Sequence, residues 1–301
     1  MPVRTIAHQR LRFPDVLGFV LGRMSRWPRR VLDGFGYVAY VLVYRIVRWR
    51  RTLSATNIAN AFPDKSPEAR QQILQQSYRN LGRFLAESLW GWNASAEALA
   101  SRVRILNPEL ISRFTGNGQS VVLLAAHFCN WEWLLLTAGV VLKVPIDAVY
   151  KPQRIKGIDE FLKARRARFG GNPIPHQSFM FEVMKRRNDV RAYALVADHT
   201  PKHNEEKYWT RFLNQDTAFF VGADKIAKIL KAPVIYVAMR RDGPGRYNVE
   251  LKLLAEPPYD RDSGPEIVER YARMLEQEIR RSPADWLWLH RKWKYVKPLY
   301  A

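Results

Sequence analysis

The chain has 301 residues, of which 47% are hydrophobic, and a formal net charge of +21 at pH 7. This hydrophobic fraction excludes a largely disordered chain, because disordered chains lack the apolar side chains that offset the entropy of ordering. The single cysteine, Cys129, excludes an intrachain disulfide and therefore a disulfide-stapled secreted scaffold. The positive charge favours an anionic partner, which can be nucleic acid, anionic lipid or an acidic protein.

Arginines are concentrated at the start of the chain. Residues 1–60 contain eleven arginines, no lysine and only two acidic residues, Asp15 and Asp33. The arginines are interleaved with aromatic and aliphatic residues, a composition that suits a layer of lipid headgroups, where arginine meets phosphate and aromatic rings lie at the interface. We therefore predict that residues 1–100 form a helical region that associates with an anionic membrane surface, on the cytoplasmic face of the inner membrane.

Two helices are predicted within this region. The apolar stretch GFGYVAYVLVY, residues 34–44, is shorter than the roughly 20 apolar residues that a membrane-spanning helix needs. We interpret it as a helix that lies in the membrane interface, and a buried core helix is the alternative. Farther along, Ser66 as N-cap and Pro67 at the first helical position predict a helix whose apolar stripe runs from Ile73 to Leu89.

From about residue 119, short apolar runs alternate with helical stretches. The predicted strands are SVVLLAA, IDAVY, AYALVA and APVIYVAMR, and the predicted helices between them are WLLLTAGVVL, FLKARRARF and ADKIAKIL. This order predicts that residues 101–301 form an α/β domain with a mixed, mostly parallel sheet and flanking helices. We expect YNVELKLL to add an antiparallel strand and PEIVERYARMLEQEIRR a late helix. The loops at the carboxyl ends of the parallel strands are the expected place for chemistry.

The segment AAHFCNWEW places His127 directly after a predicted strand, with Glu132 five positions later. On one continuous helix this spacing is a rotation of about 140°, so the two side chains would not share a face. If His127 lies on a loop, Asn130 can cap the next helix and Glu132, in its first turn, can reach back to the imidazole. The glutamate would fix the tautomer while the other ring nitrogen removes a proton from an attacking hydroxyl. The alternative is that His127 is only a capped histidine in a turn, with no catalytic role. We also count Asn130 among the substrate-binding residues.

Seven sequence blocks follow one another along most of the chain. They are RRTLSATNIANAFPDKS, AAHFCNWEW, AVYKP, RRARFGG, ALVADHTP, TRFLNQDTAFFVGADKIAKILKAPVIYVAMRR and PADWLWLHRKWK. In these blocks and in their order the chain resembles the late acyltransferases of lipid A biosynthesis, the lauroyl and myristoyl transferases, within the wider lysophospholipid acyltransferase group.

The resemblance implies that His127 and Glu132 are the catalytic pair and that Arg166 and Asp198 support them. We assign Arg166, Arg168 and Asp198 to substrate binding, since either arginine could hold a phosphate or carboxylate bidentately. The alternative for the arginines is a solvated helix face. The alternative for Asp198, which ends a predicted strand, is a turn cap.

Other chemistries have weaker support. Cys129 beside His127 could be a nucleophile, but a small buried thiol is the commoner outcome. His199 and His203 have the spacing of zinc ligands, yet Pro201 forbids an ordinary helix between them and no third ligand is obvious, so we expect no metal and no cofactor. The sequence has no G-x-S-x-G elbow, Walker loop or Rossmann glycine pattern. No RNP, zinc-finger or helix-turn-helix pattern supports nucleic-acid binding, the alternative class.

The sequence thus predicts an O-acyltransferase that moves a fatty acyl group from a thioester to a hydroxyl of a membrane lipid, a lipid A precursor. The resemblance implies acyl carrier protein as the donor, an acidic partner that suits a basic surface, and acyl coenzyme A is the alternative. The segment FLNQDTAFFVG departs from the threonine-rich version of the enterobacterial enzymes. A lysophospholipid, an aminolipid or another glycolipid is therefore the alternative acceptor.

Overall fold

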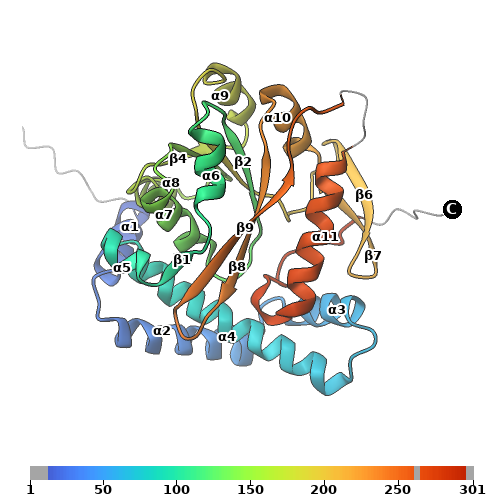
Figure 1. Cartoon of the computed structure of the whole chain (residues 1–301). Coiled ribbons are helices and arrows are strands. Elements are labelled where there is room, and N and C mark those ends of the chain that lie inside the picture. The colour runs from blue at the N-terminus through green and yellow to red at the C-terminus, as the bar shows by residue number, and fades with distance from the viewer. Residues whose placement is uncertain (1–12, 261–264, 296–301) are drawn as a thin grey trace, which may run out of the picture.

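Helices form the first part of the chain in the computed structural model, which describes residues 13–260 and 265–295. In order they are α1 (Phe13–Met24), α2 (Arg29–Val41), the π-helical turn η1 (Leu42–Ile46), α3 (Arg51–Ala61), α4 (Pro67–Gly91) and α5 (Ala96–Ala100). Figure 1 shows α2 and α4 side by side across one end of the molecule. The expected helices are therefore present in the described part of residues 1–100, while residues 1–12 of this prediction lie outside the described residues.

The start of α4 has the predicted capping pattern. The Ser66 hydroxyl accepts a hydrogen bond from the backbone N–H of Ala69 at 3.2 Å, and Pro67 is the first residue of the helix. Both features favour helix initiation, because the side chain satisfies a free N–H and proline has no N–H to satisfy. The helix buries Leu74 and Leu89 of its predicted apolar stripe.

Two glycines set the contact between α2 and α4. A Cβ atom at Gly36 would lie 2.6 Å from the carbonyl oxygen of Gly82, and one at Gly82 would lie even closer to the carbonyl oxygen of Gly36. Any larger residue would therefore force the two backbones apart. The contact fixes α2 against α4 along its buried side.

The two sides of α2 differ in burial. Leu32 and Tyr40 are buried beside the glycine contact, whereas Val31, Phe35 and Val38 on the other side are exposed. The predicted helix over residues 34–44 thus corresponds to most of α2 and the beginning of η1. Among the described residues, no helix is both long enough and apolar enough to cross a membrane.

Seven strands of the described chain form the main sheet, in the order β1–β9–β8–β2–β5–β3–β4. From β8 to β4 the paired strands are parallel, whereas β9 is antiparallel to β8 and parallel to the short edge strand β1. The mostly parallel sheet and the antiparallel strand YNVELKLL are confirmed. The strand bounds are β1 (Val103–Ile105), β2 (Val121–Ala125), β3 (Ile146–Tyr150), β4 (Gly171–Pro175), β5 (Ala192–Val196), β8 (Val234–Arg241) and β9 (Tyr247–Ala255).

Helices connect these strands and cover the sheet. The predicted helices appear as α7 (Trp131–Val141), α8 (Lys156–Arg166), α10 (Gly222–Leu230) and α11 (Glu266–Arg281). Three helical elements in this part were not predicted as such: α6 (Glu109–Thr115), α9 (Phe179–Lys185) and the 3-10 turn η2 (Pro283–Asp285). Strand β4 also escaped prediction, because its sequence GNPIP contains two prolines, which a sheet tolerates at an edge strand such as this one.

A separate hairpin, β6 (Lys207–Phe212) and β7 (Gln215–Phe220), was also not predicted. Its two-residue turn is formed by Leu213 and Asn214, with φ angles of 50° and 64°. Positive φ at both positions is typical of a type I′ turn, which usually contains glycine. Because this turn has no glycine, the sequence carried no clear hairpin signal.

The glycine contact generates a stability prediction with a control on the same helix. We expect Gly36→Ala to lower the free energy of unfolding by about 1–3 kcal/mol, because its Cβ would overlap the backbone of α4. Gly34→Ala should instead raise it by about 0.5–1 kcal/mol, since position 34 faces open space and alanine favours a helix. Urea unfolding of both variants checks this, and equal effects would contradict the packing described for α2.

Candidate active site

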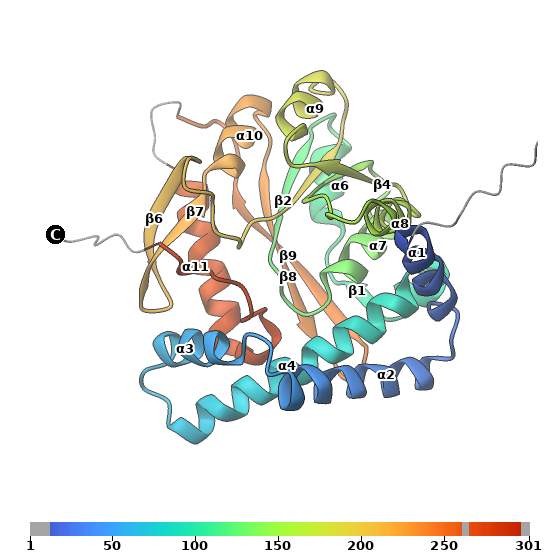
Figure 2. The ribbon, with the colours of Figure 1, turned by 180° about the vertical axis from the view of Figure 1, so that it is seen from behind.

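His127 lies on the loop that follows β2, at the carboxyl end of that strand, as predicted. A stretch that we call the C-terminal segment, residues 285–293, runs beside this loop. The backbone N–H of Cys129 donates to the carbonyl of Asp285 at 2.9 Å, and the N–H of Leu287 donates to the carbonyl of His127 at 3.0 Å. The next helix, α7, packs against α4, and Figure 2 shows it beside the end of α4. The loop is therefore held from both sides.

Asp198 contacts His127 twice. Its Oδ1 lies 2.7 Å from Nδ1 of the imidazole, and its Oδ2 accepts the backbone N–H of His127 at 3.1 Å. The indole N–H of Trp286, in the C-terminal segment, donates to the same Oδ2 at 2.8 Å. Asp198 follows β5, which pairs with β2 in parallel, so both residues lie at the same edge of the sheet.

The charge state of Asp198 fixes the tautomer of His127. Burial alone would raise the pKa of this fully buried carboxyl, but the charge that His127 carries when protonated and the hydrogen bond from it outweigh burial and hold the pKa well below its usual value. An ionised carboxylate only accepts hydrogen bonds, so in the neutral imidazole Nδ1 carries the proton and Nε2 presents a lone pair. No described residue hydrogen-bonds Nε2, and the side chain of His127 is 17% exposed. The imidazole is therefore arranged as a base that can receive a proton at Nε2.

Glu132 does not make the contact that we expected from the sequence. It lies in the first turn of α7, and Asn130 caps that helix by accepting the N–H of Trp133 at 3.0 Å, both as predicted. Its carboxylate, however, binds Arg166 at the end of α8, at 2.5 and 3.0 Å, while Asp198 takes the place beside His127. The physical reason is strand adjacency, which brings a residue 71 positions away closer to the imidazole than the local glutamate.

Both predicted substrate arginines are bound within the protein. Arg166 forms the buried bidentate pair with Glu132, which raises the pKa of this guanidinium against the opposing effect of burial. Arg168 donates to the backbone carbonyls of Trp92 at 2.8 Å and Ala94 at 2.9 Å, and so holds the connection between α4 and α5. The predicted contact of either arginine with a substrate anion stays a prediction.

Aromatic rings flank the imidazole of His127. Trp131 meets it edge to face with ring centroids 5.0 Å apart, and Phe84 stacks on Trp131 at 4.0 Å. The ring centroid of His199 lies 4.3 Å from that of His127. The imidazole therefore has aromatic neighbours on these sides.

The C-terminal segment contributes residues that the sequence analysis did not assign. Burial lowers the pKa of His290 to about 3, so its ring is neutral, and among the described residues neither ring nitrogen has a hydrogen-bond partner. Lys292 is buried, and its Nζ donates to the carbonyl of Ala218 at 3.0 Å and lies 3.7 Å from the ring centroid of Phe219. The WLWLHRKWK block carried a signal for these residues, namely cations and a histidine set among tryptophans.

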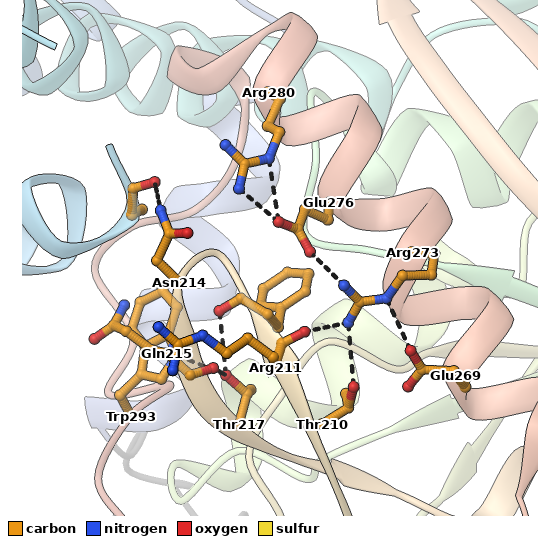
Figure 3. Close-up of polar contacts among 12 residues, drawn as sticks. Thr210, Arg211, Asn214, Gln215, Thr217, Glu269, Arg273, Glu276, Arg280 and Trp293 are labelled. Atoms are coloured by element: carbon orange, nitrogen blue, oxygen red, sulfur yellow. Dashed lines mark hydrogen bonds and ion pairs between the residues drawn. The ribbon is translucent and has the colours of Figure 1, made fainter. Parts of the chain in front are cut away.

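The β6–β7 hairpin supports the C-terminal segment, as Figure 3 shows. Arg273 of α11 donates to Thr210 of the hairpin at 3.2 Å and to Glu276 at 2.9 Å. From the segment, the indole N–H of Trp293 donates to Thr217 at 2.7 Å, and Asn214 at the turn donates to the carbonyl of Ala61 in α3 at 3.2 Å. The hairpin thus joins α3, α11 and the C-terminal segment.

Neither the thiol of Cys129 nor the pair of His199 and His203 is arranged for the alternative chemistries. Cys129 is buried with φ of 54°, its thiol points to the carbonyl of Met239 at 3.5 Å, and burial raises its pKa well above the usual value. Such a thiol is a poor nucleophile, because the thiolate is the reactive form. His199 lies against His127, whereas His203 lies 6.0 Å from the ring of Tyr295, between centroids.

Comparison with known proteins gives one family. The profile described as "Bacterial lipid A biosynthesis acyltransferase" matches residues 16–295. A lipid A biosynthesis acyltransferase of Haemophilus influenzae is 24% identical over 256 residues, covering 80% of this chain and 74% of its own. The lipid A biosynthesis lauroyltransferase of Escherichia coli is 22% identical, covering 91% and 89%, and the palmitoleoyltransferase of the same organism is 20% identical, covering 92% and 90%. The resemblance seen in the sequence blocks is confirmed.

Lys292 generates a prediction for stability against pH. Burial lowers its pKa in the folded protein from 10.5 to about 7, so between these two values the unfolded chain binds more protons than the folded one. Stability from this group must therefore rise as pH increases through that window, by on the order of 5 kcal/mol in all, and is flat below pH 7. Urea unfolding from pH 7 to 10.5 should give a steeper rise for the wild type than for Lys292→Met. Parallel curves would show that Lys292 is not desolvated as described.

Proposed function

The chain belongs to the bacterial lipid A biosynthesis acyltransferase family, and on this premise we propose that it transfers a fatty acyl group from an acyl thioester to a hydroxyl of a lipid A precursor. The observation that carries the proposal is the pairing of His127 with Asp198, which leaves Nε2 available at the carboxyl end of β2. The rest of the reaction follows from this base.

The proposed reaction has two proton transfers, one to His127 and one from it. Nε2 of His127 takes the proton of the acceptor hydroxyl as the oxygen attacks the thioester carbonyl, and Asp198 stabilises the imidazolium that results. The tetrahedral intermediate then expels the thiolate as the carbon–sulfur bond breaks, and the imidazolium returns the proton to sulfur. The products are the ester and a free thiol, and no acyl-enzyme forms.

Glu132 has a different part in this proposal from the one that the sequence suggested. Its buried pair with Arg166 joins the first turn of α7 to the end of α8. A second buried carboxylate, Glu87 of α4, accepts the side-chain amide of Asn130 at 2.9 Å. We treat both as positioning groups that hold the helix after the His127 loop, with Asp198 as the direct partner of the imidazole.

The donor and the membrane setting also belong to the proposal. The net charge of +21 favours acyl carrier protein, an acidic donor, over acyl coenzyme A, although the phosphates of coenzyme A are anionic too. The exposed side of α2 presents Val31, Phe35 and Val38 in a row, with Arg26 and Arg30 exposed near its start. Apolar groups next to arginines suit the headgroup layer of an anionic membrane, and we place this side of α2 on the cytoplasmic face of the inner membrane.

Substitutions at the three acid–base positions test which carboxylate serves His127. His127→Ala should lower turnover at least ~100-fold, because the attacking hydroxyl loses its base. Asp198→Asn should lower kcat by up to about 10⁴-fold, since an amide can donate to Nδ1 and leave the proton on Nε2, the loss seen when other His–Asp enzymes hold the wrong tautomer. Steady-state kinetics with a purified acceptor and acyl carrier protein thioester measure both effects.

Glu132→Gln is the matched control for Asp198→Asn. It should cost about 3–5 kcal/mol of stability, because Arg166 loses the charge of its partner, but the fraction that stays folded should keep the wild-type pH profile of kcat. The opposite result, an active Asp198→Asn variant and an inactive but folded Glu132→Gln variant, would restore Glu132 as the partner of His127.

Cys129 offers a test of direct transfer. Cys129→Ala should retain most of the activity, because the buried thiol has no role in the proposed steps. Mass spectrometry of the wild-type enzyme quenched during turnover should find no acylated Cys129 peptide. A Cys129 thioester that forms and decays at the rate of turnover would replace direct transfer by a two-step route.

A further inference from the structure

A cluster of arginines lies where the β8–β9 turn reaches the N-terminal helices. Arg29 is the first residue of α2, Arg102 directly precedes β1, and Arg246 lies in the turn between β8 and β9. The backbone carbonyl of Arg102 accepts the N–H of Tyr247 at 2.8 Å, which ties the start of β1 to that turn. Figure 1 shows the turn approaching α2 and α4.

Neutral groups provide most of the contacts of two of these guanidinium groups. Arg29 and Arg102 both face the ring of Trp90, at 5.7 and 5.0 Å from its centroid, and Arg29 also faces Trp133 at 5.7 Å. Arg29 packs directly on Gly245, where an added Cβ would collide with the guanidinium. The two cations are thus brought together on one indole ring.

The described residues accept few hydrogen bonds from the guanidinium groups of Arg29 and Arg102. Arg102 makes one long bond, 3.4 Å, to the carbonyl of Gly245, and Arg29 has an ion pair of 3.7 Å with Asp33, whose side chain is 55% exposed. Nη1 of Arg29 is buried and has no hydrogen-bond partner within residues 13–260 and 265–295. A guanidinium group carries five N–H donors, so the pair has many more donors than these contacts satisfy.

The positive charge of the cluster is also poorly compensated. Burial lowers the pKa of Arg102, and the charges of Arg29 and Arg246 lower it further, whereas Asp33 and Glu87 only partly oppose them. Glu87 is already hydrogen-bonded to Asn130 and Tyr247, and Asp242, at the other end of the turn, is exposed. An arrangement of like charges with free donors is stabilised by a bound anion.

We propose that Arg29 and Arg102, beside the turn that carries Arg246, form a binding site for a phosphate group, supplied by the headgroup of a membrane lipid. A phosphate has several oxygens that can accept from two or three guanidinium groups at once, with bidentate geometry that lysine cannot offer. The neighbours of Arg29 fit an amphiphilic ligand, because Trp27 is 43% exposed and Val31 is 50% exposed. The exposed apolar side of α2 then starts next to the phosphate site, where it could contact the acyl chains of a lipid whose headgroup is bound there.

A pair of double variants with equal charge change tests the proposal without any measurement of acyl transfer. Arg29→Gln/Arg102→Gln removes the two cations on Trp90, and Arg113→Gln/Arg187→Gln removes two exposed cations from α6 and from the turn after α9. Binding to phosphatidylcholine vesicles that contain phosphatidic acid is measured by co-sedimentation at fixed ionic strength. We expect the first variant to lose about 10- to 30-fold in affinity, at about 1 kcal/mol per arginine, and the control to lose less than about 5-fold.

A soluble phosphate ester, glycerol 3-phosphate, shows whether the site binds a free phosphate or requires a lipid headgroup. If glycerol 3-phosphate raises the melting temperature of the wild type and of the control, but not of Arg29→Gln/Arg102→Gln, the site takes a free phosphate as well as a lipid one. If only the vesicles discriminate between the variants, the site requires the lipid. Equal losses of vesicle affinity in both double variants, with no selective effect of glycerol 3-phosphate, would overturn the proposal.

The wild-type protein provides a measurement that does not depend on the variants folding. Phenylglyoxal modifies accessible arginines, and peptide mass spectrometry reports the rate at each position. Vesicles with phosphatidic acid should protect Arg29 and Arg102 relative to Arg187, whereas vesicles of phosphatidylcholine alone should not. Equal modification of these arginines with and without phosphatidic acid would also overturn the site.

Discussion

The buried carboxylate of Asp198 is the group on which the arrangement around His127 depends. Removing a carboxylate from water costs several kcal/mol, and here three N–H groups, two of them from His127 and one from Trp286, offset this cost. Because the backbone and the ring of His127 contact the same carboxylate, one interaction fixes both the position of the residue and the proton on Nδ1. Three chain segments, the ends of β2 and β5 and the C-terminal segment, meet at this group.

Two more buried carboxylates hold the structure that follows the His127 loop. Glu87 of α4 accepts hydrogen bonds from Asn130 and Tyr247, and Glu132 is paired with Arg166. The first turn of α7 is thereby joined to α4 on one side and to α8 on the other. A change in either pair would move the loop without touching the reacting atoms, so loss of activity at these positions would not identify a residue that touches substrate.

Local patterns in the sequence predicted many of the elements but not the contacts between them. The strand before His127, the Asn130 cap and the Ser66–Pro67 helix start each depend on a few neighbouring residues, and all three are present. The partner of His127 could not be predicted in the same way, because Asp198 reaches it only through the pairing of β2 with β5. For the same reason Trp286, which is distant along the chain, could not be assigned, although its sequence block was visible.

The contribution of Trp286 has a consequence for the biosynthesis of the enzyme. When β9 has been synthesised, α2, α4 and every strand of the described sheet have been synthesised too. Trp286, which binds Asp198, and Leu287, which binds the carbonyl of His127, have not yet been translated. Translation proceeds from the N-terminus, so the exposed side of α2 leaves the ribosome long before the imidazole acquires its final surroundings. The surroundings of His127 are therefore completed only after the N-terminal helices and all strands of the main sheet have been synthesised.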